Sequence, residues 1–144
     1  MPSYQVSIEF AVPPAAVFAA ASDLPGHGTW SADELEVIAV DDARVGAGKR
    51  YRSVAKSKGK TFEAGIEVTE YRAPERFAFT VHDFTGDYTH VFTVAARDGG
   101  TRLTRAISGQ LSVAQALLFY LVYLPVKRPN ARRALARLKE RLEA

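Results

Sequence analysis

The chain contains no cysteine, which excludes disulfide bonds, thiolate metal sites and a cysteine nucleophile. Its three histidines, at positions 27, 82 and 90, have no spacing that would place them on one helix face as a metal site. The longest apolar run, ALLFYLVYLPV over 116–126, is too short to span a bilayer. The first residues, MPSYQVSIEF, lack the basic start and apolar run of a signal peptide. We therefore expect a cytoplasmic protein with no metal site and no transmembrane segment.

Motifs that bind nucleotides or activate a nucleophile are also absent. The sequence has no GxGxxG or P-loop, no HExxH and no GxSxG elbow. Nucleotide-dependent chemistry therefore lacks support, and we expect no cofactor.

The composition is that of one ordinary globular domain over 1–144, with 47% hydrophobic and 24% charged residues. The net charge is +3, and seven of the 19 Lys and Arg fall in 127–144. Glu140 and Glu143 interrupt this basic segment and no nucleic-acid motif accompanies it, so we expect a solvated helix face and no nucleic-acid partner. Peripheral contact of this segment with a membrane stays open, and nothing in the sequence specifies an oligomeric state.

The order of predicted elements begins with a half-buried strand over 3–11, where apolar and polar residues alternate. A short helix over 12–23 and a turn-rich segment over 24–30 follow. Six further strands are predicted over 34–42, 48–57, 61–71, 75–84, 87–96 and 101–111.

The last predicted element is a helix over 113–143, in which Pro125 and Pro129 are expected to produce a kink or a break. Its apolar face is expected to consist of Leu117, Tyr120, Leu124, Leu135, Leu138 and Leu142. The whole order predicts an α+β fold. A seven-stranded twisted antiparallel sheet wraps around the long C-terminal helix, with two short helices between strands 1 and 2 and room for an internal cavity.

Five landmarks occur in the same order in a known group of proteins. They are IEFAVPPAAVFAAASDLPGHGTW (8–30), VGAGKRYR (45–52), VTEYRAPERFAF (68–79), GGTRLT (99–104) and LARLKERLE (135–143). With them the chain resembles the START-like, or Bet v 1-like, helix-grip superfamily (SRPBCC), often described as polyketide cyclase/dehydrase. The resemblance implies a steroid, lipid, hormone or polyketide as ligand, and some members cyclise or dehydrate polyketides. It brings no catalytic residues with it, because no catalytic signature is shared across the superfamily.

The segment VHDFTGDYTHVF (81–92) predicts a hairpin with Thr85-Gly86 as its two-residue loop, which places Val81 opposite His90. The inner face would then carry Phe77, Phe79, Val81, Asp83, Tyr88, His90, Phe92 and Val94, with His82 on the outer face. A carboxylate such as Asp83 near His90 would raise the pKa of the imidazole and suit it to acid/base chemistry. The alternative is a histidine that is only hydrogen-bonded within a pocket wall.

A second hairpin, at Lys58-Gly59, predicts another row of inward side chains. This row consists of Tyr51, Ser53 and Ala55 opposite Phe62, Ala64, Ile66 and Val68. The hydroxyls of Tyr51 and Ser53 are either ligand anchors or ordinary core groups.

Arg105 is expected to point inward if the preceding turn is Asp98-Gly99 or Gly99-Gly100, whereas a three-residue loop would reverse its face. A guanidinium inside an apolar cavity requires a partner. Asp83, Glu63 or an oxyanion of a ligand would serve.

The cavity mouth and roof are expected to come from the helices. Trp30 and His27 either border a gate made flexible by neighbouring glycines or cap the core. In the C-terminal helix, Leu117, Tyr120 and Leu124 would roof the cavity, with Phe119 and Tyr123 at its flank.

Two principal functions follow from this pattern. The first is binding of a hydrophobic small molecule in a pocket of about 300–1,000 Å³. The second is a polyketide aromatase/cyclase or dehydratase in which His90 or Tyr88 moves protons and Arg105 stabilises an enolate. A third reading is an interaction protein that uses its basic C-terminal helix. The predicted ligand-binding residues are Trp30, Tyr51, Ser53, Phe62, Ala64, Ile66, Phe79, Val81, Asp83, Phe92, Leu117, Tyr120 and Leu124.

Overall fold

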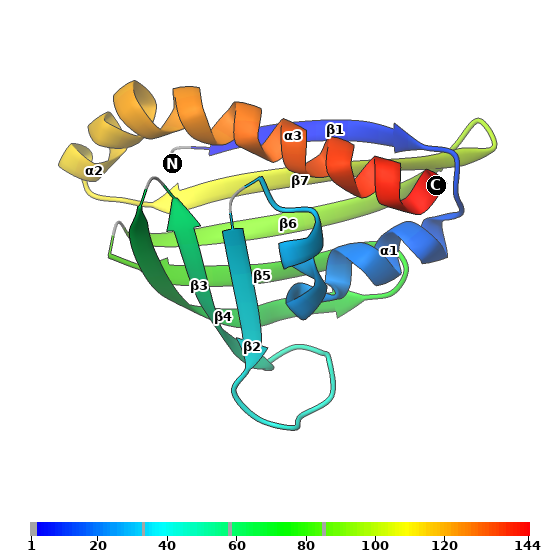
Figure 1. Ribbon diagram of the computed structural model, residues 1–144, viewed down its shortest axis with the longest axis horizontal. Helices are drawn as coiled ribbons and strands as arrows, with labels where there is room; N and C mark the ends of the chain where they lie inside the picture. The colour runs from blue at the N-terminus through cyan, green and yellow to red at the C-terminus, as the bar shows by residue number, and fades with distance from the viewer. Residues whose placement is uncertain (1–2, 33, 58, 85) are drawn as a thin grey trace.

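The computed structural model describes residues 3–32, 34–57, 59–84 and 86–144. Seven strands form one antiparallel sheet in the order β1-β7-β6-β5-β4-β3-β2 (Figure 1). The strands are β1 (Ser3–Phe10), β2 (Glu34–Ala39), β3 (Arg50–Ser57), β4 (Lys60–Arg72), β5 (Arg76–Asp83), β6 (Gly86–Arg97) and β7 (Gly100–Gln110). The helical elements are α1 (Pro14–Ser22), the 3₁₀ helix η1 (Leu24–Thr29), α2 (Val113–Leu118), the π turn η2 (Phe119–Tyr123) and α3 (Leu124–Glu143).

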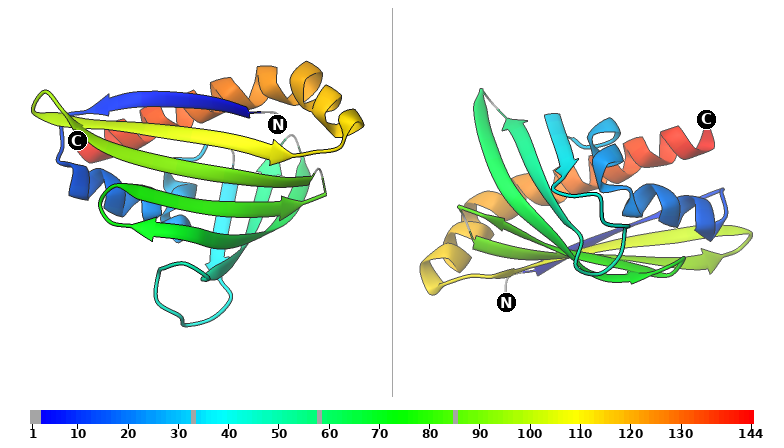
Figure 2. Two further views of the ribbon diagram at one scale, coloured as in Figure 1. Left: turned by 180° about the vertical axis from the view of Figure 1, so that it is seen from behind. Right: turned by 90° about the horizontal axis from the view of Figure 1, so that it is seen from below.

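This arrangement confirms the predicted α+β fold. The helices lie on the concave side of the curved sheet, with α3 running beside β1 (Figures 1 and 2). Alternation in β1 places Val6 and Phe10 in the core, and Gln5 and Glu9 in solvent. The inward face of the sheet is therefore buried against the helices along part of its strands, which stabilises both layers at once.

The β5–β6 hairpin has the predicted faces in a different register. Phe79, rather than Val81, lies opposite His90. A shift of two residues preserves which side chains share a face, because side chains alternate with a period of two. His90 therefore points inward, and His82 lies on the outer face, where its Nδ1 is 2.8 Å from Oδ1 of Asp87.

The turn of this hairpin explains the shift. Asp83 pairs with Gly86, so Gly86 belongs to β6 and not to the connecting loop. Thr85, which was predicted to share the loop with it, lies outside the described residues. Phe84 is 72% exposed and stacks on Phe62, with ring centroids 5.7 Å apart.

The other two hairpins match the predicted pairing. In β3 and β4, Ser53 lies opposite Ala64, as the Lys58-Gly59 loop requires, although Lys58 itself is not among the described residues. Before β7, Asp98 and Gly99 both have positive φ, 42° and 82°, as a type I′ turn demands. This turn places Arg105 on the inner face, so the inward prediction is confirmed.

The C-terminal helix continues from 113 to 143 without a break, although Pro129 lies inside it. Its irregularity is the π turn, in which the Leu124 N–H donates to the Phe119 carbonyl. A π turn contains one extra residue, which rotates the preceding segment by about 100° relative to α3.

This rotation overturns part of the predicted apolar face. Phe119 is only 2% exposed, whereas Leu117 and Tyr120 are 60% and 49% exposed, and Leu124 is half-buried. Beyond the π turn the predicted face holds, with Leu135 and Leu138 buried and Leu142 half-buried.

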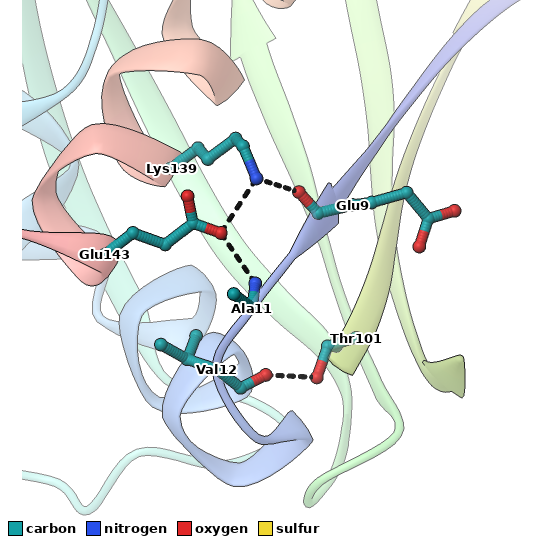
Figure 3. Close-up of polar contacts among 6 residues, drawn as sticks. All are labelled: Glu9, Ala11, Val12, Thr101, Lys139 and Glu143. Atoms are coloured by element: carbon teal, nitrogen blue, oxygen red, sulfur yellow. Dashed lines mark hydrogen bonds and ion pairs between the residues drawn. The ribbon is translucent and has the colours of Figure 1, made fainter. Parts of the chain in front are cut away.

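Polar contacts fasten the end of α3 to the edge strand β1 (Figure 3). Lys139 Nζ donates to the Glu9 carbonyl at 2.6 Å and pairs with Glu143 Oε1 at 2.7 Å. The same Glu143 oxygen accepts from the Ala11 N–H at 2.6 Å. Arg137 also donates to a backbone carbonyl, that of Ser31, at 2.5 Å. Part of the basic segment is thus used within the fold, as expected of a helix face that covers a sheet edge.

Thr101 forms a hydrogen bond next to these contacts, and this bond provides a test of how the end of β1 is held in the fold. Its side chain is fully buried, and its Oγ1 donates to the Val12 carbonyl at 2.6 Å (Figure 3). We expect Thr101→Val to keep the side-chain volume but to lower the free energy of unfolding by about 1 kcal/mol, because the Val12 carbonyl loses its donor. Urea denaturation measures this change. Thr104→Val is the control, since the Thr104 hydroxyl contacts Ser7 at an exposed position, and we expect a change below about 0.5 kcal/mol. Equal losses in both variants would contradict the assignment.

Candidate functional site

The inner face of the sheet changes in burial along its strands. At one end its side chains are almost fully covered by α1, η1 and α3. These covered residues include Val68, Phe77, Phe92, Val94 and Leu103. Toward the other end, near the β3–β4 and β5–β6 turns, many inward side chains are only half-buried, although Ile107 and Phe79 on either side of His90 are buried. We call this second group the open end of the concave face. It consists of Tyr4, Leu35, Ala55, Phe62, Ala64, Val81, Asp83, Tyr88, His90 and Arg105.

Arg105 lies at the boundary between the covered end and the open end, and it is the cation of the group. It lies on β7 between Phe92 of β6 and Val6 of β1. Its Nη2 donates to His90 Nδ1 at 3.1 Å, and its guanidinium carbon lies 5.1 Å from the centroid of the Phe92 ring. Its Nε is closed off from solvent and makes no hydrogen bond within the described residues.

The expected partners of Arg105 are not found at its side. Glu63 is exposed on the outer face of β4, and none of the ion pairs in the described part of the chain includes Arg105. Burial lowers the pKa of Arg105, but an arginine keeps its charge at neutral pH. The residue as a whole is half-buried while Nε is fully enclosed, and the enclosed atom decides the cost of the charge.

His90 is held as a neutral imidazole, which corrects the prediction of a raised pKa. Its ring stacks on Phe79, with centroids 4.8 Å apart. Burial lowers the pKa of His90 well below its ordinary value, and the charge of Arg105 lowers it further. Asp83 does not counter this effect, because the observed register places it four residues along β5 from Phe79, about 13 Å away along the strand.

Two phenols and one ring from the C-terminal helix surround this pair. Phe119 of η2 lies 6.1 Å from the ring of Tyr4 and 6.4 Å from that of Tyr88. Burial raises the pKa of Tyr4, with Arg105 acting in the opposite direction, so its hydroxyl is protonated at neutral pH. Phe119 was not among the predicted site residues. Its place beneath the helix depends on the π turn, and the regular spacing of apolar residues gave no sign of that turn.

His27 and Trp30 belong to the core, which supports the second of the two interpretations offered for them. They are 5% and 3% exposed, and their rings lie 4.5 Å apart. His27 Nε2 is 2.6 Å from the Ala21 carbonyl. Gly28 lies directly against the backbone of Leu35, where a Cβ has no room. The glycine therefore serves close packing.

The predicted pocket residues of β3 and β4 divide between the two ends. Tyr51, Ser53 and Ile66 are 2%, 8% and 6% exposed and lie in the covered part, whereas Phe62 and Ala64 lie at the open end. Lys49 Nζ lies 5.4 Å from the centre of the Tyr51 ring.

A separate groove of about 480 Å³ runs between β1 and α3. Its walls are formed by Gln5, Val6, Ser7, Ile8, Arg128, Arg132 and Leu135. None of the predicted pocket residues is among them. We assign the site to the open end of the concave face, because the enclosed polar groups gather there and the groove is an open feature of the sheet edge.

The described ranges contain neither a cluster of metal-ligating side chains nor a membrane-spanning helix. No group of three or more histidines, aspartates or glutamates there could hold a metal ion. No described helix has the length and apolarity needed to cross a membrane.

Comparisons with known proteins agree with the fold. A family model described as "Polyketide cyclase / dehydrase and lipid transport" matches residues 1–143. No curated protein matches the chain. Solved structures do match, and three of them illustrate the range of identity.

Protein TTHA0849 from Thermus thermophilus is 26% identical, with a TM-score of 0.77 over 98% of this chain and 97% of that one. Protein CV1439 from Chromobacterium violaceum is 19% identical, with a TM-score of 0.79 over 100% and 99%. The structure titled Ara h 8.0201 is 15% identical, with a TM-score of 0.70 over 98% and 97%. The last two show a shared fold alone.

His27 gives a pH test of the packed core. Burial, opposed by the hydrogen bond to Ala21 and assisted by Arg105, lowers the pKa of His27 to about 3. The unfolded chain takes up this proton near pH 6.5 and the native chain does not, so the stabilisation is complete above pH 6.5 and is lost as the pH falls toward 3.

We therefore expect the difference in free energy of unfolding between the native sequence and His27→Gln to stay constant above pH 7. Between pH 6 and 4 it should shrink by up to ~1.4 kcal/mol per pH unit. Urea denaturation at several pH values measures it, and parallel stability curves for the two proteins would contradict the buried, neutral state of His27.

Proposed function

The chain belongs to the polyketide cyclase / dehydrase and lipid transport family, and from this premise we propose that it binds a hydrophobic small molecule at the open end of its concave face. The observation that carries this proposal is the change in burial along the inner face. Strand pairing places Phe62, Ala64 and Val81 on the inner face, and yet they remain half-buried, with Phe84 stacked on the ring of Phe62. An inward apolar surface that the protein leaves partly exposed is available for contact with an apolar ligand.

The energetics favour an apolar ligand with few polar contacts. Each Å² of apolar surface that a ligand removes from water contributes roughly 25 cal/mol. Ligand pockets typically combine such walls with a small number of polar groups that fix orientation. Tyr88, His90 and Arg105 are the polar groups that we assign to this role.

We assign the roof of this site to α2 and η2. The principal neighbours of η2 along the chain are α2 and α3, whereas α3 itself packs on β1. Phe119 reaches down to the tyrosines, while Leu117 and Leu121 are 60% and 69% exposed. A helical segment held mainly by one aromatic ring requires less free energy to move away than one with a fully packed apolar face. We therefore place the entry of the ligand at this end.

A second candidate function is that of a cyclase or dehydratase. It is favoured by the hydrogen bond between Arg105 and His90, which places a cation beside a neutral base. In this reaction a carbon next to a substrate carbonyl loses its proton to His90, and Arg105 stabilises the enolate oxygen. The lowered pKa of His90 makes it a weak base, which is why we place binding first.

Filling the site tests the binding proposal. We expect 1-aminoanthracene, a neutral apolar fluorophore, to bind at about one molecule per chain, and Ala64→Trp to abolish its binding by occupying the open end. The control is Glu63→Trp, which adds the same ring to the outer face of the same strand. Fluorescence titration compares them after circular dichroism shows that both fold. Unchanged binding by a folded Ala64→Trp protein would refute the site.

The choice between binding and catalysis depends on His90. If the protein is a binder, His90→Ala removes about one hydrogen bond, so we expect the affinity for the fluorophore and for polyketide-like ligands to fall by roughly tenfold or less. If it is an enzyme, the variant loses on the order of 10²–10⁴ in rate while still binding its substrate. His82→Ala, on the outer face, is the control. Turnover of poly-β-ketone thioesters by the native protein that vanishes in His90→Ala at preserved affinity would establish the second function.

A further inference from the structure

Arg105 is an enclosed cation for which the described chain supplies no counter-ion. Its Nη2 is used by the neutral His90, and its Nε has no partner. No carboxylate in the described ranges pairs with it. An isolated charge that leaves water costs several kcal/mol, and proteins normally offset this cost with a carboxylate.

The groups around Arg105 leave the region positive. Tyr4 comes from β1, His90 and Tyr88 from β6, His27 from η1 and Lys127 from α3. At neutral pH the charges that act on His90 are those of Arg105 and Lys127, because the lowered pKa of His27 leaves it neutral. Asp83 is the carboxylate at the open end, but it lies four residues along β5 from Phe79, so the immediate surroundings of Arg105 and His90 are positive.

We propose that the ligand carries a carboxylate on an apolar body and that Arg105 binds this carboxylate at the open end of the concave face. This inference rests on the proposed function and names its ligand class: amphiphilic organic acids. The carboxylate would face the guanidinium, and the apolar body would extend from it along the inner face past Val81 toward Ala64, which strand pairing places several residues farther along the sheet.

The chemistry of the guanidinium favours a carboxylate over a neutral carbonyl. A guanidinium donates in a planar fork, and a carboxylate accepts with two oxygens in the same plane. The hydrogen bond from Nη2 to His90 Nδ1 fixes the orientation of this fork. The unpartnered Nε–H provides a donor that a ligand oxygen satisfies, and the negative charge offsets the buried cation in the same step.

The test compares cis-parinaric acid with its methyl ester, which have the same apolar body and differ in the head group. Three folded proteins are titrated by fluorescence at pH 7.5: the native chain, Arg105→Met, and Arg102→Met as control. Arg102 lies on the outer face of the same strand and is exposed, so its removal changes the net charge equally. Arg105→Gln is a second variant should Arg105→Met not fold.

We expect the native chain and Arg102→Met to bind the acid roughly ten- to a hundredfold more tightly than the ester. In Arg105→Met this preference should vanish while the affinity for the ester stays within about threefold. Its thermal unfolding midpoint should not fall, because an apolar side chain replaces a buried charge.

Other outcomes separate the two proposals. Equal affinity of the native chain for acid and ester would overturn the carboxylate inference and leave the apolar site standing. A preference for the acid that persists in Arg105→Met and Arg105→Gln would show that another group binds the head. Binding of neither probe would refute both the proposed function and the ligand class.

Discussion

The inner face of the single curved sheet must be covered, and most features of this protein depend on which part of that face the helices cover. Seven strands direct their inward side chains toward α1, η1 and α3, but these helices cover only one end fully. The covered end, with Phe77, Phe92 and Leu103 almost inaccessible, supplies the hydrophobic stabilisation. The partly covered end lies on the same strands, and α1, η1 and α3 do not cover it fully. The proposed binding site lies where the packed core stops, so the core beside it would hold its walls in place.

The enclosed polar groups of the core and of the open end follow a similar division. His27 satisfies its ring nitrogen with the Ala21 carbonyl and contributes to packing. Arg105 has a neutral neighbour and an unpartnered Nε, which is an arrangement that does not favour the free protein. Proteins commonly retain such unfavourable groups where function requires them, and the rest of the fold compensates for the cost. The ring nitrogen of His27 has a hydrogen-bond partner, whereas the Nε of Arg105 has none within the described residues. This contrast is the reason for assigning the two residues different roles.

The sequence was sufficient to predict which side chains face inward, but it did not predict the register of the β5–β6 hairpin. Alternation along 75–84 and 87–96 placed His90 inward and His82 outward, and this result survived an error of two residues in the turn, because an even shift preserves faces. The same error placed Asp83 too close to His90 and led to a raised pKa instead of a lowered one. Arg105 was placed inward on condition of a two-residue turn before it, and Asp98-Gly99 forms that turn. Phe119 was placed at the flank of the cavity and not in its wall, since helical spacing assumes 3.6 residues per turn and η2 departs from it. The roles of all these side chains in ligand binding remain proposals.

The π turn also bears on how this architecture can vary between relatives. A single inserted or deleted residue in a sheet strand would reverse its faces and disrupt the core, but η2 can gain or lose one residue as a local change of pitch. Loss of that residue would rotate α2 by about 100° and bring a different side chain, such as Tyr120, to the position of Phe119. The fastening of α3 to β1 through Lys139 and Glu143 would be untouched, because it lies on the other side of the turn. A change of one residue at η2 would therefore alter the side chains that α2 and η2 present to the proposed site and would leave the contacts between α3 and β1 unchanged.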